Sequence, residues 1–95
     1  MNLVYLPSAA ADLAWFRDYY ERIFPEGAAR ARERVRAVEA VLIDNPRAGR
    51  PTHREDVRRF PVTRTPFAFV YRVTAERIEV LRVLDTRAFE PGSLG

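Results

Sequence analysis

The spacing of apolar residues changes twice along the chain, from strand-like to helix-like and back. A short apolar run at residues 2–6, closed by Pro7, predicts a first strand. Apolar residues then recur every three or four positions, which predicts an amphipathic helix over 9–24 with Ser8 as its N-cap. The apolar stripe of this helix consists of Leu13, Phe16, Tyr20 and Ile23.

A second helix is predicted over 26–44, because small and aliphatic residues again repeat at three- and four-residue intervals. The break at Pro25-Glu26-Gly27 is short, so the two helices are expected to form an antiparallel hairpin. Asn45-Pro46 ends the second helix and opens a polar loop over 45–56. The narrow apolar seam of this helix consists of Ala28, Ala31, Val35, Val38 and Leu42.

The rest of the chain contains three runs rich in β-branched and aromatic residues, at 57–62, 67–74 and 77–84. The last two are apolar on both faces and only a short turn separates them, so they predict a central hairpin. The order strand, helix, helix, strand, strand, strand predicts an α+β fold with one domain over residues 1–95. Its helical hairpin would cover one face of a mostly antiparallel sheet and leave the other face open.

Composition narrows the classes of function. The chain has no cysteine, which excludes disulfides, thiolate metal sites and a cysteine nucleophile. With one histidine and no clustered carboxylates, no metal, cofactor or small-molecule ligand is expected. The start MNLVYLP lacks the features of a secretory signal, and no apolar run approaches the ~20 residues of a membrane span. A cytoplasmic protein without membrane association is therefore expected.

All sixteen basic residues are arginines, against thirteen acidic residues, and the net charge is +3. A GC-rich coding sequence explains such a bias, and so does a phosphate or carboxylate partner, because the guanidinium fork suits both anions. Composition does not separate the two explanations.

Several of these arginines stand in the predicted strands, where alternate side chains share a face. Arg72 then shares a face with Ala68 and Val70, and Arg82 with Ile78 and Val80. Arg58 likewise goes with Phe60 and Val62. Because an unpaired guanidinium is too costly in a core, we expect these arginines to form a patch on the open face. The alternative is that each pairs with a nearby carboxylate, and the candidates are Glu55, Asp56, Glu76, Glu79 and Asp85.

Four segments taken together resemble the RelE/ParE superfamily of bacterial toxins, the toxic halves of type II toxin–antitoxin pairs. They read NPRAGRP, VRRFPV, TPFAFVYRV and RIEVLRVLDTR, and the resemblance covers almost the whole chain. It implies the fold reached above and a hetero-oligomer with a cognate antitoxin. Such antitoxins usually offer a disordered, acidic and apolar segment that folds onto the toxin.

The superfamily divides by target. RelE-like members are mRNA endonucleases on the ribosome, whereas ParE-like members are associated with DNA gyrase and have no nuclease chemistry. RNA cleavage needs groups that take and give protons, which arginine does poorly. His53 stands in the polar loop, Tyr71 falls in an apolar stripe, and neither histidine nor tyrosine follows Arg87.

The ParE-like branch and gyrase are therefore favoured, although Asp85 stands where many relatives of that branch have a histidine. No catalytic residue is assigned with confidence, and whether the chain is an enzyme stays open. One alternative is an mRNA endonuclease that uses Arg59, Arg82 and Arg87, and the other is a non-toxic binding module of the same fold.

The resemblance also implies a surface that meets the target or the antitoxin. Trp15, Phe16, Tyr19 and Tyr20 are more aromatic surface than one helix stripe needs, so some are expected to be exposed, unless all four belong to the core. Pro91-Gly92 indicates a loss of order in the tail. The predicted contact residues are Arg58, Arg59, Arg72, Arg82, Arg87, Trp15 and Tyr19.

Overall fold

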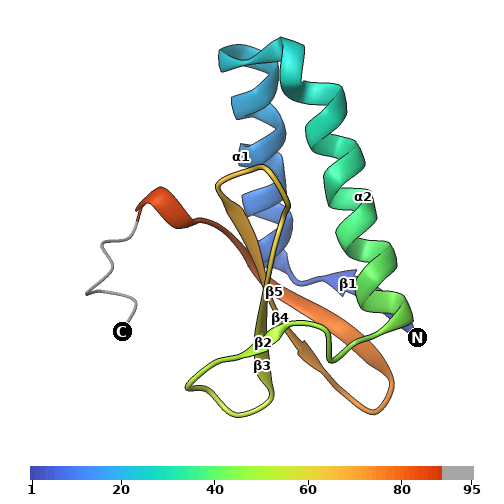
Figure 1. The fold of residues 1–95 in the computed structure, drawn as a ribbon. Helices are drawn as coiled ribbons and strands as arrows, with labels where there is room; N and C mark the ends of the chain where they lie inside the picture. Colours follow the sequence, from blue (N-terminus) through green and yellow to red (C-terminus); the bar gives the residue numbers. More distant parts are fainter. Residues whose placement is uncertain (89–95) are drawn as a thin grey trace.

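The chain was analysed as a computed structural model, which describes residues 1–88, and its elements follow the predicted order (Figure 1). The prediction about Pro91-Gly92 lies outside the described residues. The elements are β1 (Asn2–Tyr5), α1 (Pro7–Ile23), the 3-10 turn η1 (Pro25–Gly27), α2 (Ala28–Asp44), β2 (Arg50–Pro51), β3 (Val57–Pro61), β4 (Phe67–Val73), β5 (Arg77–Asp85) and the 3-10 turn η2 (Thr86–Ala88).

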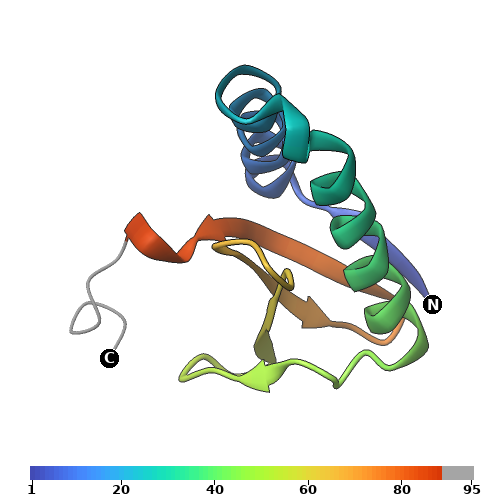
Figure 2. The same ribbon diagram turned by 45° about the horizontal axis from the view of Figure 1, so that its top comes forward.

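Helices α1 and α2 form the predicted hairpin and lie together on one side of the sheet (Figure 2). The prediction that Ser8 caps α1 is wrong, because the helix begins two residues earlier than predicted, at Pro7, and its N-cap is Leu6. Proline suits the first helical position, since its fixed φ is helical and the missing N–H would have no partner there. The Tyr5 hydroxyl of β1 donates a hydrogen bond to the Glu39 carboxylate of α2, which fastens the second helix to the sheet.

The sheet has the strand order β1-β5-β4-β3-β2. Only β1 and β5 are parallel, and all other neighbours are antiparallel. Strands β4 and β5 are central, as their two apolar faces predicted. The two-residue strand β2 falls within the predicted polar loop and pairs with β3 through Arg50 and Arg59. Two residues are too few for a period-two pattern, so the sequence could not predict it.

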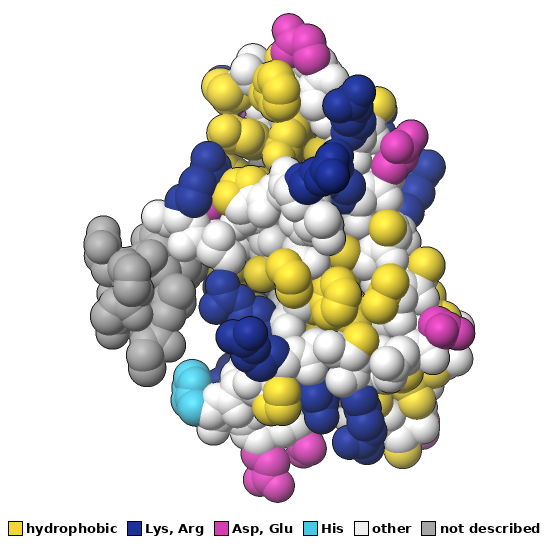
Figure 3. Space-filling model, viewed as in Figure 1, with side chains coloured by type: hydrophobic (Ala, Val, Ile, Leu, Met, Phe, Trp, Pro, Cys, Tyr) yellow, Lys and Arg dark blue, Asp and Glu magenta, His cyan; other side chains and the backbone are white. Residues whose placement is uncertain are grey.

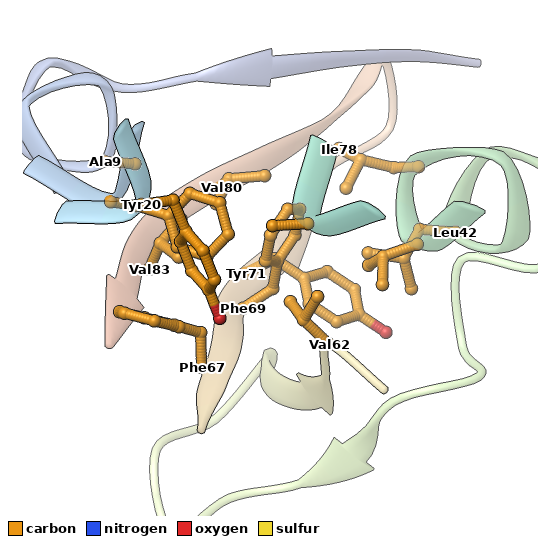
Figure 4. Close-up of a cluster of buried hydrophobic side chains, with 13 residues drawn as sticks. Ala9, Tyr20, Leu42, Val62, Phe67, Phe69, Tyr71, Ile78, Val80 and Val83 are labelled. Carbon is orange, nitrogen blue, oxygen red and sulfur yellow. The ribbon is translucent and has the colours of Figure 1, made fainter. Parts of the chain in front are cut away.

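The core lies between the helical hairpin and the facing side of β4 and β5 (Figure 4). Phe69, Tyr71, Ile78 and Val80 are fully buried there. The predicted stripe of α1 holds for Phe16 and Tyr20 but is wrong for Ile23, which is 65% exposed. The last turn of α1 extends beyond the strands of the sheet (Figure 1).

The buried Tyr71 side chain fixes the loop that follows α2. Its hydroxyl donates to the Pro46 carbonyl at 2.8 Å and accepts from the Gly49 backbone N–H at 2.8 Å. The phenol therefore bridges two backbone groups of the loop, and this holds β2 beside β3. The prediction that Tyr71 belongs to the core is correct.

Within residues 1–88, no helix combines the length and the apolar character that a membrane crossing requires.

Candidate functional site

The register of the sheet decides which arginines lie on the face away from the helices. Residues directly opposite in neighbouring strands project to the same side. Arg59 is opposite Val70, which is opposite Arg82, and Arg72 is opposite Glu79. These positions alternate with the buried Phe69 and Tyr71, so Arg59, Arg72 and Arg82 lie on the open face.

Arg58 is on the other side, and its predicted place on the open face is wrong. It lies opposite Tyr71, whose side chain points toward the helices. Its guanidinium donates to the Gly49 carbonyl at 2.7 Å and to the Arg47 carbonyl at 3.3 Å. Loop carbonyls at the margin of the sheet thus satisfy a cation that no core would accept unpaired.

A β-bulge in β5 sets the position of Arg82. The register shifts between Val70, which pairs with Arg82, and Tyr71, which pairs with Val80, so Leu81 has no partner. An extra residue in a strand exchanges the two faces of the sheet for the side chains that follow it. Arg82 therefore lies on the open face although Ile78 and Val80 are fully buried, and the predicted sharing of one face by these three residues is wrong.

Internal carboxylates hold two of the open-face arginines. Arg72 pairs with Glu79 at 2.6 Å, and Arg77 pairs with the other oxygen of the same carboxylate at 2.7 Å. Hydrogen bonds from Arg72 and Arg77 lower the pKa of Glu79. Arg82 binds both oxygens of Asp12 on α1, at 2.7 and 3.1 Å, and this pairing raises the pKa of Arg82.

Arg87 in η2 is paired in the same way. Its guanidinium donates to both oxygens of Asp85, at 3.1 and 3.0 Å. The hydrogen bond lowers the pKa of Asp85, and the carboxylate together with the Tyr19 hydroxyl raises the pKa of Arg87.

The prediction of a patch of unpaired arginines is therefore wrong for Arg72 and Arg82, and Arg87 is paired as well. The alternative of nearby carboxylates is correct for Arg72 with Glu79 and for Arg87 with Asp85, whereas Asp12, the partner of Arg82, was not among its candidates. All three side chains are nevertheless 45–57% exposed. Their carboxylate partners are only 8–19% exposed, so an incoming anion can contact these cations, but pulling a cation away would leave a largely buried carboxylate unpaired.

Arg59 differs from the others. Within residues 1–88 its half-buried side chain makes no hydrogen bond or ion pair, and it lies directly opposite Arg50 of β2. Like charges that face each other across a ladder destabilise it. Uncompensated positive charge on the open face is thus concentrated at the β2–β3 margin, and Arg50 is a cation there that the sequence-based prediction missed.

Aromatic residues of α1 form a second exposed surface, which we call the aromatic ledge and define as Trp15, Tyr19 and Ile23. Trp15 is 54% exposed and stacks on Tyr19, with ring centroids 5.5 Å apart and planes at 19°. It also approaches the core ring of Phe67 at 6.0 Å. Figure 3 shows apolar side chains gathered over the end of α1 and η1.

The chain matches the family model described as ParE toxin of type II toxin-antitoxin system, parDE, over residues 3–88. The chain belongs to this family. Among solved structures, the ParE-family chain is similar to a protein from the "Chromosomal ParDE TA system from P. aeruginosa", with 35% sequence identity and a TM-score of 0.71. The match covers 87% of this chain and 92% of that chain. The comparison with curated proteins finds no match.

The resemblance stated from the sequence segments is thereby confirmed, and so is the ParE-like branch. By its family, this chain is a toxin of the type II class. Its fold of two helices on a five-stranded sheet agrees with that of its structural neighbour.

Within residues 1–88, neither His53 nor Tyr71 forms a hydrogen bond with an open-face arginine of this ParE-family chain. His53 is exposed in the loop between β2 and β3. Tyr71 is fully buried on the opposite side of the sheet, and burial raises the pKa of its hydroxyl. No group of three or more histidine, cysteine or carboxylate side chains converges within residues 1–88.

Proposed function

We propose that this ParE-family toxin interferes with DNA gyrase in the cytoplasm and that a cognate antitoxin neutralises it by direct binding. The family match over residues 3–88 is the observation that carries the proposal. The geometry supports it, because the exposed groups are guanidinium and aromatic side chains that serve binding.

The proposed contact surface joins the open face to the aromatic ledge. Arg59, Arg72 and Arg82 supply cations on the open face, and Arg87 supplies one beside Tyr19 of the ledge. An acidic and apolar segment would find both kinds of partner within this surface. Arg58 contributes less than the others to the proposal, because two backbone carbonyls already accept from its guanidinium.

Arg72, Arg82 and Arg87 need not be free before binding. Each is half exposed, and a partner that desolvates the pair while adding its own carboxylate or phosphate gains a charge-assisted hydrogen bond. Arg59 has no internal competitor within the described residues, so it is expected to gain the most from an anionic partner.

The decisive experiment is induction of the chain without antitoxin, combined with a cleavage assay of purified gyrase on supercoiled plasmid. Growth arrest with accumulation of cleaved plasmid is expected. Rapid loss of translated mRNA with gyrase unaffected would favour the endonuclease alternative, and undisturbed growth would favour the non-toxic module. Co-expression of a short acidic protein encoded beside this chain is expected to restore growth.

Two matched variants test the surface. Arg59→Ala removes an open-face cation that has no partner within residues 1–88 and is expected to weaken toxicity without changing the circular dichroism spectrum. Arg36→Ala removes an exposed arginine from α2 and serves as the control of equal charge. Equal loss of toxicity in both variants would show that net charge, and not this surface, sets the effect.

A further inference from the structure

A second group of arginines lies where the loop between β3 and β4 meets α2, away from the open face. Arg30 and Arg34 project from α2, and Arg64 comes from the loop. Together with Tyr20 and Phe24 they line a cavity of about 360 Å³, which we call the arginine cleft. Basic side chains gather at this junction in Figure 3.

The three cations are poorly compensated. Arg34 donates to the Thr63 carbonyl at 3.1 Å, whereas Arg30 and Arg64 make no hydrogen bond or ion pair within residues 1–88. A neighbouring hollow of about 520 Å³ shares all three arginines, so their guanidinium groups form the ridge between two depressions. Such a ridge presents its charge to both sides.

The backbone at Arg64 is strained in a way that places this cation. Its φ is +61°, a left-handed conformation that costs a residue with a Cβ about 1–2 kcal/mol. Strain of this kind persists where the surrounding structure imposes it, and it gathers at functional sites. Here it accompanies a residue that lines the same cleft as Arg30.

Two aromatic side chains, Tyr20 and Phe24, also line the cleft. Tyr20 is buried with 9% exposure, and Phe24 is 51% exposed. The Phe24 ring lies directly over Gly27, where an added Cβ would be 2.5 Å from the ring. Glycine at position 27 therefore lets the half-exposed Phe24 ring pack close to the backbone within the lining of the cleft.

We propose that the arginine cleft binds an acidic peptide segment of a partner protein, with an apolar side chain against Tyr20 and Phe24 and carboxylates on Arg30 and Arg64. A nucleic acid fits less well, because Glu26 and Glu33 stand on the walls of the two hollows and would repel a continuous row of phosphates. The cavity also has room for a few side chains only. The inference rests on the proposed function in one respect, namely that a neutralising antitoxin is the partner expected to carry such a segment.

The test uses the purified full chain and two short synthetic peptides, one alternating glutamate with leucine and one alternating glutamine with leucine. The arginine Nε–Hε signals are followed by NMR during each titration. The glutamate peptide is expected to shift the signals of Arg30 and Arg64 saturably, and the glutamine peptide to bind at least about tenfold more weakly.

A matched pair of double variants locates the site. Arg30→Gln with Arg64→Gln is expected to weaken binding of the glutamate peptide by about tenfold or more. Arg32→Gln with Arg36→Gln removes the same charge from exposed positions of α2 outside the cleft, and is expected to leave binding within about twofold.

Equal weakening by both double variants, equal binding of the two peptides, or a single-stranded oligonucleotide that displaces the glutamate peptide from Arg30 and Arg64 would each overturn the proposal. Because the assay measures binding alone, it gives its answer even if the chain has no effect on gyrase.

Discussion

At the scale of single residues, Gly49 shows how a loop position is fixed by the core. A Cβ at this position would lie 2.5 Å from the Tyr71 hydroxyl oxygen. Tyr71 cannot move aside, because it is fully buried and its hydroxyl also donates to Pro46. Gly49→Ala is therefore expected to destabilise the fold by about 1–3 kcal/mol through overpacking and loss of the hydrogen bond, measured by urea unfolding.

Gly27→Ala is the matched control for this prediction. Its Cβ would approach the Phe24 ring just as closely, but that ring is half exposed and can swing into solvent. A smaller loss of stability is expected for it. If Gly27→Ala costs as much as Gly49→Ala, the fixed position of Tyr71 is not what makes glycine necessary at position 49.

At the scale of elements, one side chain joins α1 to the margin of the sheet. Strand β1 pairs with β5 only over Arg77–Val80, so β5 beyond Val80 has no strand on that side. Asp12 accepts a hydrogen bond from the Val83 backbone N–H at 2.9 Å and also binds Arg82. A helix carboxylate thus takes the place of a missing strand neighbour.

Asp12→Ala is expected to lower the free energy of unfolding by about 1–3 kcal/mol, because it leaves a backbone donor without its partner. Asp12→Asn retains an acceptor for Val83 and is expected to cost less. Hydrogen exchange at the Val83 amide should speed up in the alanine variant. The control is Asp18→Ala, which removes only an exposed pair with Arg22 and is expected to change stability by less than about 0.5 kcal/mol. An unchanged exchange rate at Val83 would show that Asp12 does not protect this edge.

The elements themselves could be predicted from the sequence because their signal is local. Apolar periodicity gave both helices and the three longer strands, and the short connections gave the helical and strand hairpins. The bulge at Leu81 could not be predicted, because one extra residue does not change the apolar character of the run that contains it. The face on which Arg58 lies could not be predicted either. An arginine near the end of a strand can donate its hydrogen bonds to loop carbonyls, and no pattern in β3 reveals this.

The partners of the arginines depend on contacts that are distant along the chain. Asp85 is a near neighbour of Arg87, and its pairing was among the foreseen alternatives. Asp12 and Arg82 stand 70 positions apart and meet only once α1 is laid across β5. Periodicity places an element but does not give its neighbours, so the sequence could not choose between a free cation and a paired one.

At the scale of the whole molecule, the core lies between the sheet and the helical hairpin, and the arginine and aromatic side chains of the proposed contact surface lie outside it. The arginines do not identify this chain as a toxin, since Arg72, Arg82 and Arg87 are paired internally and the uncompensated charge found within residues 1–88 of the open face is concentrated at the β2–β3 margin. Its membership of the ParE toxin family does. The fold adds the half-exposed indole of Trp15 on α1, which stacks on Tyr19. Tyr19 in turn interacts with Arg87 of the proposed contact surface.

The aromatic ledge gives the antitoxin complex a direct optical test, because Trp15 is the only tryptophan in the chain. If the antitoxin covers the ledge, the half-exposed indole leaves water, so its fluorescence should shift to shorter wavelength and acrylamide should quench it less. Trp15→Phe in complex with the same antitoxin supplies the background signal. A complex that elutes intact from a gel-filtration column with unchanged Trp15 emission and quenching would place the antitoxin elsewhere, and the ledge would then remain free for the target even in the neutralised toxin.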